Sequence, residues 1–167
     1  MKRLKLDFYS QDAVTLAQQL LGKTLVRVFD DGSVRQYKIT ATEAYCGAED
    51  KACHASKGRT PRTEVMFHSG GKLYVYLIYG IYWLLNVVSG VEDNPEAVLI
   101  CGLDEIRGSG RVGRELKIDK SFYGEDLHTS KRIWIENGEE LSDFMAKPRV
   151  GVDYAEEWKD KLWRFEI

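Results

Sequence analysis

The sequence contains few cysteines and few prolines, three of each among 167 residues. An odd number of cysteines cannot pair completely, and Cys46, Cys53 and Cys101 lack the paired short spacing of a structural zinc site. Cys53 and His54 with His68 would supply three metal ligands, but no fourth ligand stands at a usual interval. We therefore expect reduced thiols and no metal ion.

No apolar run in the sequence is long enough to cross a bilayer. The nearest candidate, residues 76–88, is interrupted by tyrosines, Gly80 and Asn86. Residues 1–7 mix basic, apolar and acidic side chains and lack the apolar core and cleavage site of a signal peptide. These absences predict a cytoplasmic protein without a membrane partner.

An excess of charge of one sign is also missing, since 24 Lys and Arg stand against 26 Asp and Glu, for a net charge of -2. This balance is unfavourable for a nucleic-acid-binding protein, so the distribution of the charges matters more than their sum. The charges are nevertheless unevenly distributed. Basic residues gather in two places and acidic residues in a third: Lys57, Arg59 and Arg62; Arg107, Arg111, Arg114 and Lys117; Glu136, Glu139, Glu140 and Asp143. They either solvate the surface or form a basic, phosphate-binding face opposite an acidic one.

The composition and patterning predict one mixed α+β domain over residues 1–167. Hydrophobic residues make up 44% and charged residues 30%, which is typical of an ordered globular chain of this length. Residues 24–29 and 34–45 predict one hairpin, and residues 73–79 and 82–88 a second. Further predicted elements are a helix that Ser10 caps and Gly22 ends, strands at residues 98–103, 133–135, 149–152 and 163–167, and helices at residues 127–131 and 154–159.

Residues 46–71 form a long irregular connection, with Thr60-Pro61-Arg62 as a break near its middle. A connection of this length inside a compact domain is usually functional. It contains His54, which is either a structural histidine or a reader of a base edge, if it reaches a ligand.

Glu43 lies in an apolar part of a predicted strand, and Tyr45 shares its face two residues later. A carboxylate in this place is turned to solvent, paired, or kept for chemistry. Half-buried beside a ring, it can take a proton from water and create a nucleophile. One carboxylate is enough for a purine alkylated at N3 or N7, because such a leaving group already carries positive charge.

Four tyrosines, Tyr74, Tyr76, Tyr79 and Tyr82, alternate with aliphatic residues in the second hairpin. Such a stripe usually packs in a core and across strands, and we assign Tyr74 and Tyr82 to that role. Rings at the end of a hairpin instead meet solvent or a ligand, and stacking on a base contributes roughly 1–3 kcal/mol. A ring at the tip can also fill the gap left by an extruded nucleotide.

Several motifs occur together in one order along almost the whole chain. They are Leu20-Leu21-Gly22-Lys23, Thr42-Glu43-Ala44-Tyr45, Gly47-Ala48-Glu49-Asp50-Lys51-Ala52-Cys53-His54, Thr60-Pro61-Arg62, Met66-Phe67, Leu73-Tyr74-Val75-Tyr76-Leu77-Ile78-Tyr79-Gly80-Ile81-Tyr82, Asn86, Arg149-Val150-Gly151-Val152 and Trp163-Arg164-Phe165. In these motifs the chain resembles the alkyladenine (3-methyladenine) DNA glycosylase family, in a compact form. The resemblance implies a curved antiparallel sheet with flanking helices and a protruding β-hairpin, similar to the C-terminal domain of formyltransferases.

The resemblance also implies roles for single residues. Glu43 would be the general base for water, and the backbone carbonyl of Val150 would help to hold that water. The other implied roles are base binding by Tyr45, Ala52, His54, Tyr76 and Asn86, intercalation by Tyr79, and contacts to the DNA backbone by Arg59, Thr60, Arg62 and Arg111. The implied partner is duplex DNA with damaged purines, near the bacterial nucleoid, and the implied enzyme is a monomer without metal or organic cofactor.

The chain departs from the family pattern in two places. Cys101 stands where the family has an Arg that helps to hold the catalytic water, and Leu103 is followed almost directly by Gly108 without the usual helical segment. The leading hypothesis is a monofunctional glycosylase that flips alkylated or deaminated purines and hydrolyses the N-glycosidic bond. Because of Cys101, the alternative is a weak or inactive lesion-binding protein, and a third hypothesis is an RNA or small-ligand module.

Overall fold

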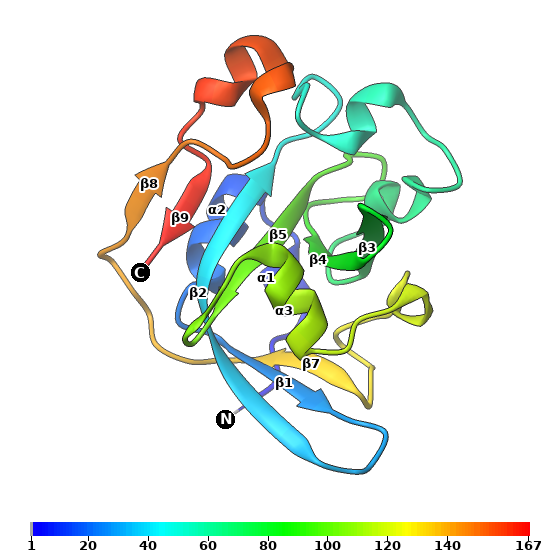
Figure 1. Ribbon diagram of the computed structural model, residues 1–167, viewed down its shortest axis with the longest axis vertical. Helices are drawn as coiled ribbons and strands as arrows, with labels where there is room; N and C mark the ends of the chain where they lie inside the picture. Colours follow the sequence, from blue (N-terminus) through cyan, green and yellow to red (C-terminus); the bar gives the residue numbers. More distant parts are fainter. Residues whose placement is uncertain (1) are drawn as a thin grey trace.

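A strongly curved antiparallel sheet forms the framework of the protein, whose computed structural model describes residues 2–167 (Figure 1). Six strands follow one another in the order β3-β4-β5-β2-β1-β7, while β6 pairs with β5, and β9 joins β2 to β8. The strands are β1 (Thr24–Val28), β2 (Val34–Tyr45), β3 (Leu73–Ile78), β4 (Tyr82–Val88), β5 (Ala97–Leu103), β6 (Ile106–Arg107), β7 (Ile133–Glu136), β8 (Met145–Lys147) and β9 (Arg164–Glu166). The predicted α+β class with a curved antiparallel sheet is confirmed.

Strand β2 belongs to two parts of this sheet. Its first residues pair with β1, and its last residues pair with β5 on one side and β9 on the other. The register with β5 shifts between Ile39 and Thr42, which marks a bulge. Since a bulge bends its strand and increases the local twist, β2 turns the sheet at this point. The turn brings Glu43 between β5 and β9.

The alternation of side chains along each strand separates a core face from a second face. Apolar residues at every other position enter the main core, together with residues of helices α2 (Ala13–Leu20) and α3 (Ser109–Glu115). The intervening positions of four neighbouring strands point to the other face: Glu43 and Tyr45, Tyr74 and Tyr76, Leu84 and Asn86, Leu99 and Cys101. The period of two in a strand therefore places the candidate site residues together.

The other helical elements of the described residues are short. They are α1 (Leu6–Tyr9) and the 3-10 helices η1 (His54–Lys57), η2 (Glu64–Phe67), η3 (Lys120–Phe122) and η4 (Asp153–Asp160). Helix α2 lies behind β2 in Figure 1, where the Thr42 hydroxyl donates to the carbonyl of Ala17 at 2.8 Å. Across residues 2–167, no helix is long and apolar enough to span a bilayer.

The predicted strands at residues 24–29, 34–45, 73–79, 82–88, 98–103, 133–135 and 163–167 are confirmed with shifts of at most one residue at either end. Three other predictions are wrong. Asp12 rather than Ser10 caps the helix, because its carboxylate accepts the backbone N–H of Thr15 at 2.9 Å. Residues 127–131 form turns around Asp126, and residues 149–152 form bends in which the Arg149 side chain is drawn inward.

Candidate active site

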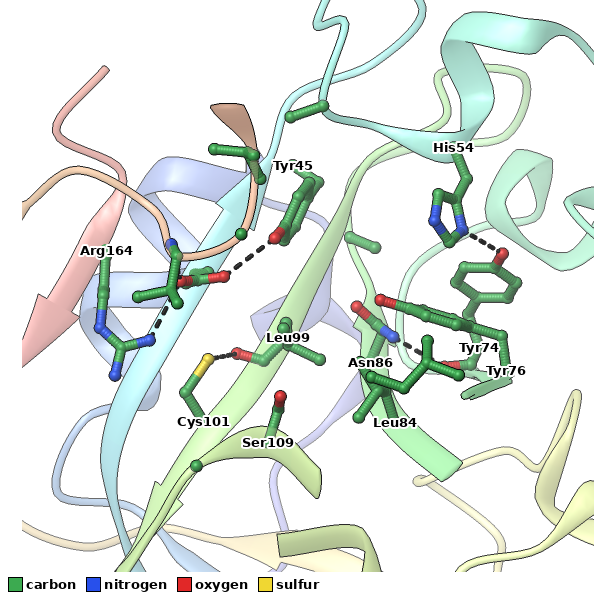
Figure 2. Close-up of a pocket in the computed structure, with 18 of the residues that line it drawn as sticks. Tyr45, His54, Tyr74, Tyr76, Leu84, Asn86, Leu99, Cys101, Ser109 and Arg164 are labelled. Atoms are coloured by element: carbon green, nitrogen blue, oxygen red, sulfur yellow. Dashed lines mark hydrogen bonds and ion pairs between the residues drawn. The ribbon is translucent and has the colours of Figure 1, made fainter. Parts of the chain in front are cut away.

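A cavity of about 590 Å³ opens on the second face of the sheet. Strands β2 to β5 form its floor, and β9 lies beside Glu43 at one edge. Further parts of the walls come from Ala52, His54, Gly108, Ser109, residues 150–152 and Tyr154 (Figure 2). The cavity therefore collects segments that lie more than a hundred residues apart in the sequence.

One row of paired residues crosses five strands on the cavity floor. Tyr74 pairs with Asn86, Asn86 with Leu99, Leu99 with Glu43, and Glu43 with Arg164. Because paired residues in a ladder point to the same face, the sheet itself aligns a phenol, an amide, a carboxylate and a guanidinium. This row sets the relative positions of the polar groups before any ligand binds.

Glu43 is buried, with 2% of its surface exposed, and its carboxylate accepts three hydrogen bonds. Its Oε1 accepts from the Tyr45 hydroxyl at 2.9 Å, and its Oε2 accepts from the Val150 N–H at 2.9 Å and from Arg164 Nη1 at 3.0 Å. These donors compensate for burial of the charged form. An ionised carboxylate has about four acceptor positions, so three donors leave room for a water molecule. The solvent-facing interpretation of Glu43 is therefore wrong.

Tyr45 forms the wall of the cavity next to Glu43. Burial, followed by the neighbouring Glu43 carboxylate, raises the pKa of the Tyr45 hydroxyl well above its ordinary value. The hydroxyl therefore stays protonated at neutral pH and donates to Glu43. The guanidinium of Arg149 lies 4.9 Å from the centre of the Tyr45 ring and supports it from behind the cavity.

The opposite wall is aromatic and carries His54, Tyr74 and Tyr76, which lie across the cavity from Tyr45 in Figure 2. His54 Nδ1 is 2.7 Å from the Tyr74 hydroxyl, and its ring centre is 4.5 Å from that of Tyr76. Burial lowers the pKa of His54 to about 4, with Arg62 and Lys57 acting in the same direction. The imidazole is thus neutral near pH 7, and its two nitrogens offer one donor and one acceptor. Aromatic rings therefore line both sides of the cavity.

Asn86 and Ala52 complete the lining of the slot. The side-chain amide of Asn86 donates to the Tyr74 carbonyl at 3.2 Å, which fixes the residue on the floor. The N–H of Ala52 donates to Asp50 at 3.1 Å, which leaves its carbonyl as the backbone group for a ligand. All the predicted base-binding residues line one cavity, and the assigned roles stay predictions.

A fully buried ion pair ties two walls of the cavity together. Arg149 donates to Asp50 at 2.6 and 2.9 Å, and both side chains have 0% exposed surface. Arg149 also donates to the carbonyls of Ala44 and Trp158 at 3.0 Å. The next residue is Val150, whose N–H reaches Glu43, so the ion pair holds that donor in place.

The rim of the cavity is exposed and partly apolar. Tyr79 at the tip of the β3–β4 hairpin is 87% exposed, as expected for a residue that meets a partner. The guanidinium of Arg62 lies 5.3 Å from the Tyr76 ring centre, and Arg59 pairs with Glu64 and Asp93. The structure does not bring Arg111 to this rim.

Two of the residues predicted to contact the DNA backbone lie in different parts of the structure. Thr60 stands in the same loop as Arg62, where its backbone N–H donates to the Thr63 hydroxyl at 2.9 Å. Arg111 instead lines a separate cavity of about 450 Å³ together with Arg35 and Lys117. Thr60 therefore has a defined loop conformation, and Arg111 lies apart from the other residues predicted to contact DNA.

Three cavity residues with polar side-chain groups were not given a role from the sequence: Ser109, Tyr154 and Arg164. Arg164 begins a short strand and stands between Trp163 and Phe165. Because side chains alternate between the two faces of a strand, a charged residue between two large aromatic residues indicates a face on which the charge has a partner. Ser109 and Tyr154 each follow a segment with a single nearby glycine and carry no comparable signal. Among the residues that the structure describes, no group of three or more His, Cys, Asp and Glu could hold a metal ion.

The chain is similar to known proteins over almost its entire length. The profile of the methylpurine-DNA glycosylase (MPG) family matches residues 7–109 and 102–167. A protein of Natranaerobius thermophilus is 43% identical over 99% of this chain and 95% of its own, and one of Desulfitobacterium hafniense is 41% identical over 100% and 96%. A third, from Methanocella arvoryzae, is 40% identical over 99% and 92%. All three carry the provisional name 3-methyladenine DNA glycosylase. The predicted resemblance is confirmed.

Proposed function

This chain belongs to the methylpurine-DNA glycosylase family, and on that premise we propose that it is a DNA repair enzyme that releases damaged purines from duplex DNA. The observation that carries the proposal is the Glu43 carboxylate, buried at the edge of an aromatic slot and held by three donors. Such a group matches what hydrolysis of an N-glycosidic bond requires of a general base. The substrates are alkylated or deaminated purines.

The proposed reaction uses the Glu43 carboxylate as its base. A water molecule at the free acceptor position of the carboxylate gives a proton to Glu43 as its oxygen bonds to C1′ of the sugar. The bond from C1′ to the purine nitrogen breaks, and its electron pair leaves with the base. An alkylated purine is positively charged, so this electron pair neutralises it, and no second acid is required for that substrate. The products are the free base and an abasic site.

Base recognition rests on the two walls of the cavity. Tyr45 on one side and Tyr76 on the other would stack on the flipped purine, and neutral His54 would meet its edge. Asn86 would crowd the exocyclic amine of guanine, and the Ala52 carbonyl would accept from the purine. An aromatic slot of this kind favours damaged bases, because a damaged base costs less free energy to unpair and flip out of the duplex.

DNA contacts are proposed for the rim. The exposed Tyr79 would fill the gap that the flipped nucleotide leaves in the stack. Arg62 and Thr60 would contact phosphates near the cavity, and Arg59 would do so if DNA displaced Glu64 or Asp93 from its guanidinium. We propose that the protein acts as a monomer.

The test is release of a modified purine under single-turnover conditions from duplexes that carry 3-methyladenine, ethenoadenine or hypoxanthine. Removal of a general base typically costs roughly 10²- to 10⁴-fold in rate, and we expect a loss in this range for Glu43→Gln. The exposed loop residue Glu49 offers a matched control, since Glu49→Gln changes the same functional group outside the cavity. Absence of release from every duplex, or equal rates for Glu43→Gln and wild type, would refute the proposal.

The alternative is a lesion-binding protein that flips bases without cutting them. The observation that favours it is Cys101, a neutral residue at a position where the resemblance implies an Arg. This alternative predicts lesion-selective, salt-sensitive binding with no base release from any of the three duplexes. The same assay therefore separates it from the enzyme.

A further inference from the structure

Position 101 cannot supply a cation to the site. Cys101 lies on the cavity face of β5, and its thiol contacts the Leu99 carbonyl at 3.6 Å. Burial, followed by the nearby Glu43 carboxylate, raises the pKa of this thiol well above its ordinary value. The side chain is therefore a neutral thiol, and the water-holding role implied for an Arg at this position is vacant on β5.

A guanidinium reaches the same carboxylate from a different strand. Arg164 on β9 is the cross-strand partner of Glu43, and its Nη1 donates to Glu43 Oε2 at 3.0 Å. The Arg164 side chain is 17% exposed and that of Glu43 2%, so water screens this pair only weakly. Figure 2 shows Arg164 across the cavity from Tyr76, with its end group at one of the interactions drawn as dashed lines.

The guanidinium is held in a fixed orientation by its neighbours. Arg164 Nε donates to Glu166 Oε1 at 2.7 Å, and the other oxygen of Glu166 accepts from Lys147 at 3.0 Å. The hydrogen bond from Arg164, and then the one from Lys147, lowers the pKa of Glu166, which keeps this anchor charged. A guanidinium has five N–H donors, and two are used here, so others remain for a water beside Glu43.

We propose that Arg164 is a positioning residue that fixes the orientation of the Glu43 carboxylate and of the attacking water, in place of an Arg at position 101. This proposal rests on the proposed glycosylase function. It assigns to the C-terminal strand a role in the chemical step, in addition to its pairing with β2. A merely structural ion pair would instead stabilise the contact of β2 with β9 and leave the chemical step unchanged in folded protein.

The experiment compares single-turnover base release and lesion-duplex affinity for wild type and three variants. Loss of one preorganised donor typically costs about 10²- to 10³-fold in rate, and we expect Arg164→Gln to lose at least about 10-fold while its Kd changes less than about threefold. Arg164→Lys, which keeps the charge but not the planar fork, should fall between the two. Lys38→Gln breaks an exposed ion pair with Glu139 outside the cavity and should release base at the wild-type rate.

Two rescue experiments distinguish a positioning role of Arg164 from a purely structural one. Introducing Cys101→Arg into Arg164→Gln places a guanidinium on the same cavity face, and we expect it to recover about 10-fold or more of the lost rate. Methylguanidinium added to Arg164→Ala should raise the rate saturably, while sodium chloride at the same ionic strength should not. Urea unfolding of every variant identifies conditions under which all are folded.

The outcomes are separable from those of the proposed function. A wild-type protein that releases no base refutes the glycosylase function itself. An active wild type with Arg164→Gln at the wild-type rate overturns the role of Arg164. So does the failure of both rescues in folded protein, because a relocated or added guanidinium would then not replace the lost one.

Discussion

The buried ion pair between Asp50 and Arg149 gives the most demanding prediction about stability. The Asp50 carboxylate accepts four hydrogen bonds: two from Arg149, one from the Cys46 N–H at 2.9 Å and one from the Ala52 N–H at 3.1 Å. Asp50→Asn keeps the size of the side chain but removes its charge. Its single amide oxygen can accept about two of these bonds. The Arg149 guanidinium would therefore stay buried beside a neutral amide that does not balance its charge.

The expected cost follows from this geometry. Leaving one member of a buried ion pair without its partner typically costs about 3–5 kcal/mol. Arg149 keeps its bonds to the carbonyls of Ala44 and Trp158, so we expect about 3 kcal/mol, the lower end of that range. For a domain of 150–250 residues, each kcal/mol changes Tm by roughly 2–4 °C, which gives a decrease of about 6–12 °C.

Urea unfolding followed by tryptophan fluorescence measures this cost, because Trp158 and Trp163 lie close to Arg149. The matched control is Arg35→Gln, which breaks an ion pair with Glu115 on the surface. We expect no measurable change in its unfolding midpoint, since exposed pairs contribute little. If Asp50→Asn and Arg35→Gln had equal midpoints, the argument that this pair holds the cavity walls would be refuted.

Two further predictions concern His54 and Glu156. The pKa of His54 is lowered to about 4 in the folded protein against about 6.5 in an unfolded chain, so protonation favours unfolding. Stability should therefore fall by up to about 3 kcal/mol as the pH drops from 6.5 to 4. In urea unfolding, His54→Gln should lose that part of the pH dependence, whereas the exposed control His128→Gln should keep it. Parallel curves of stability against pH for His54→Gln and wild type would contradict this prediction. Glu156 has φ 56° and ψ -133°, a conformation suited to glycine that costs other residues about 1–3 kcal/mol. Glu156→Gly should raise the urea midpoint although it loses the ion pair with Lys51. Lys51→Gln measures the loss of that ion pair alone. A lower midpoint for Glu156→Gly would contradict the argument that the backbone at Glu156 is strained.

Most of the strands were predictable because two-residue alternation and turn residues are local signals. Helix α3 was not, because Gly108, Gly110 and Gly113 suggest a loop. A Cβ on Gly113 would lie 1.9 Å from the carbonyl oxygen of Trp83, so this glycine lets the helix pack directly on β4. The same residue thus lowers helix propensity and permits the tertiary contact. Only the lower helix propensity can be recognised from the sequence pattern.

The candidate site divides in a similar way. Glu43 and Tyr45 could be placed on one face from their spacing, and the aromatic wall from the tyrosine stripe. The guanidinium of Arg164 could not be placed, because its contact with Glu43 depends on pairing between strands that are 121 residues apart. Likewise the expected strand at residues 149–152 is replaced by bends, since Arg149 bonds to Asp50 inside the protein rather than lying along a sheet.

The most direct test of the account is the single-turnover rate of base release from a duplex with one 3-methyladenine, measured for wild type and for Glu43→Gln at equal, saturating protein. We predict rapid release by wild type and a rate lower by roughly 10²- to 10⁴-fold for the variant, with lesion binding retained. Equal rates in the two proteins would contradict the assignment of Glu43 as the general base.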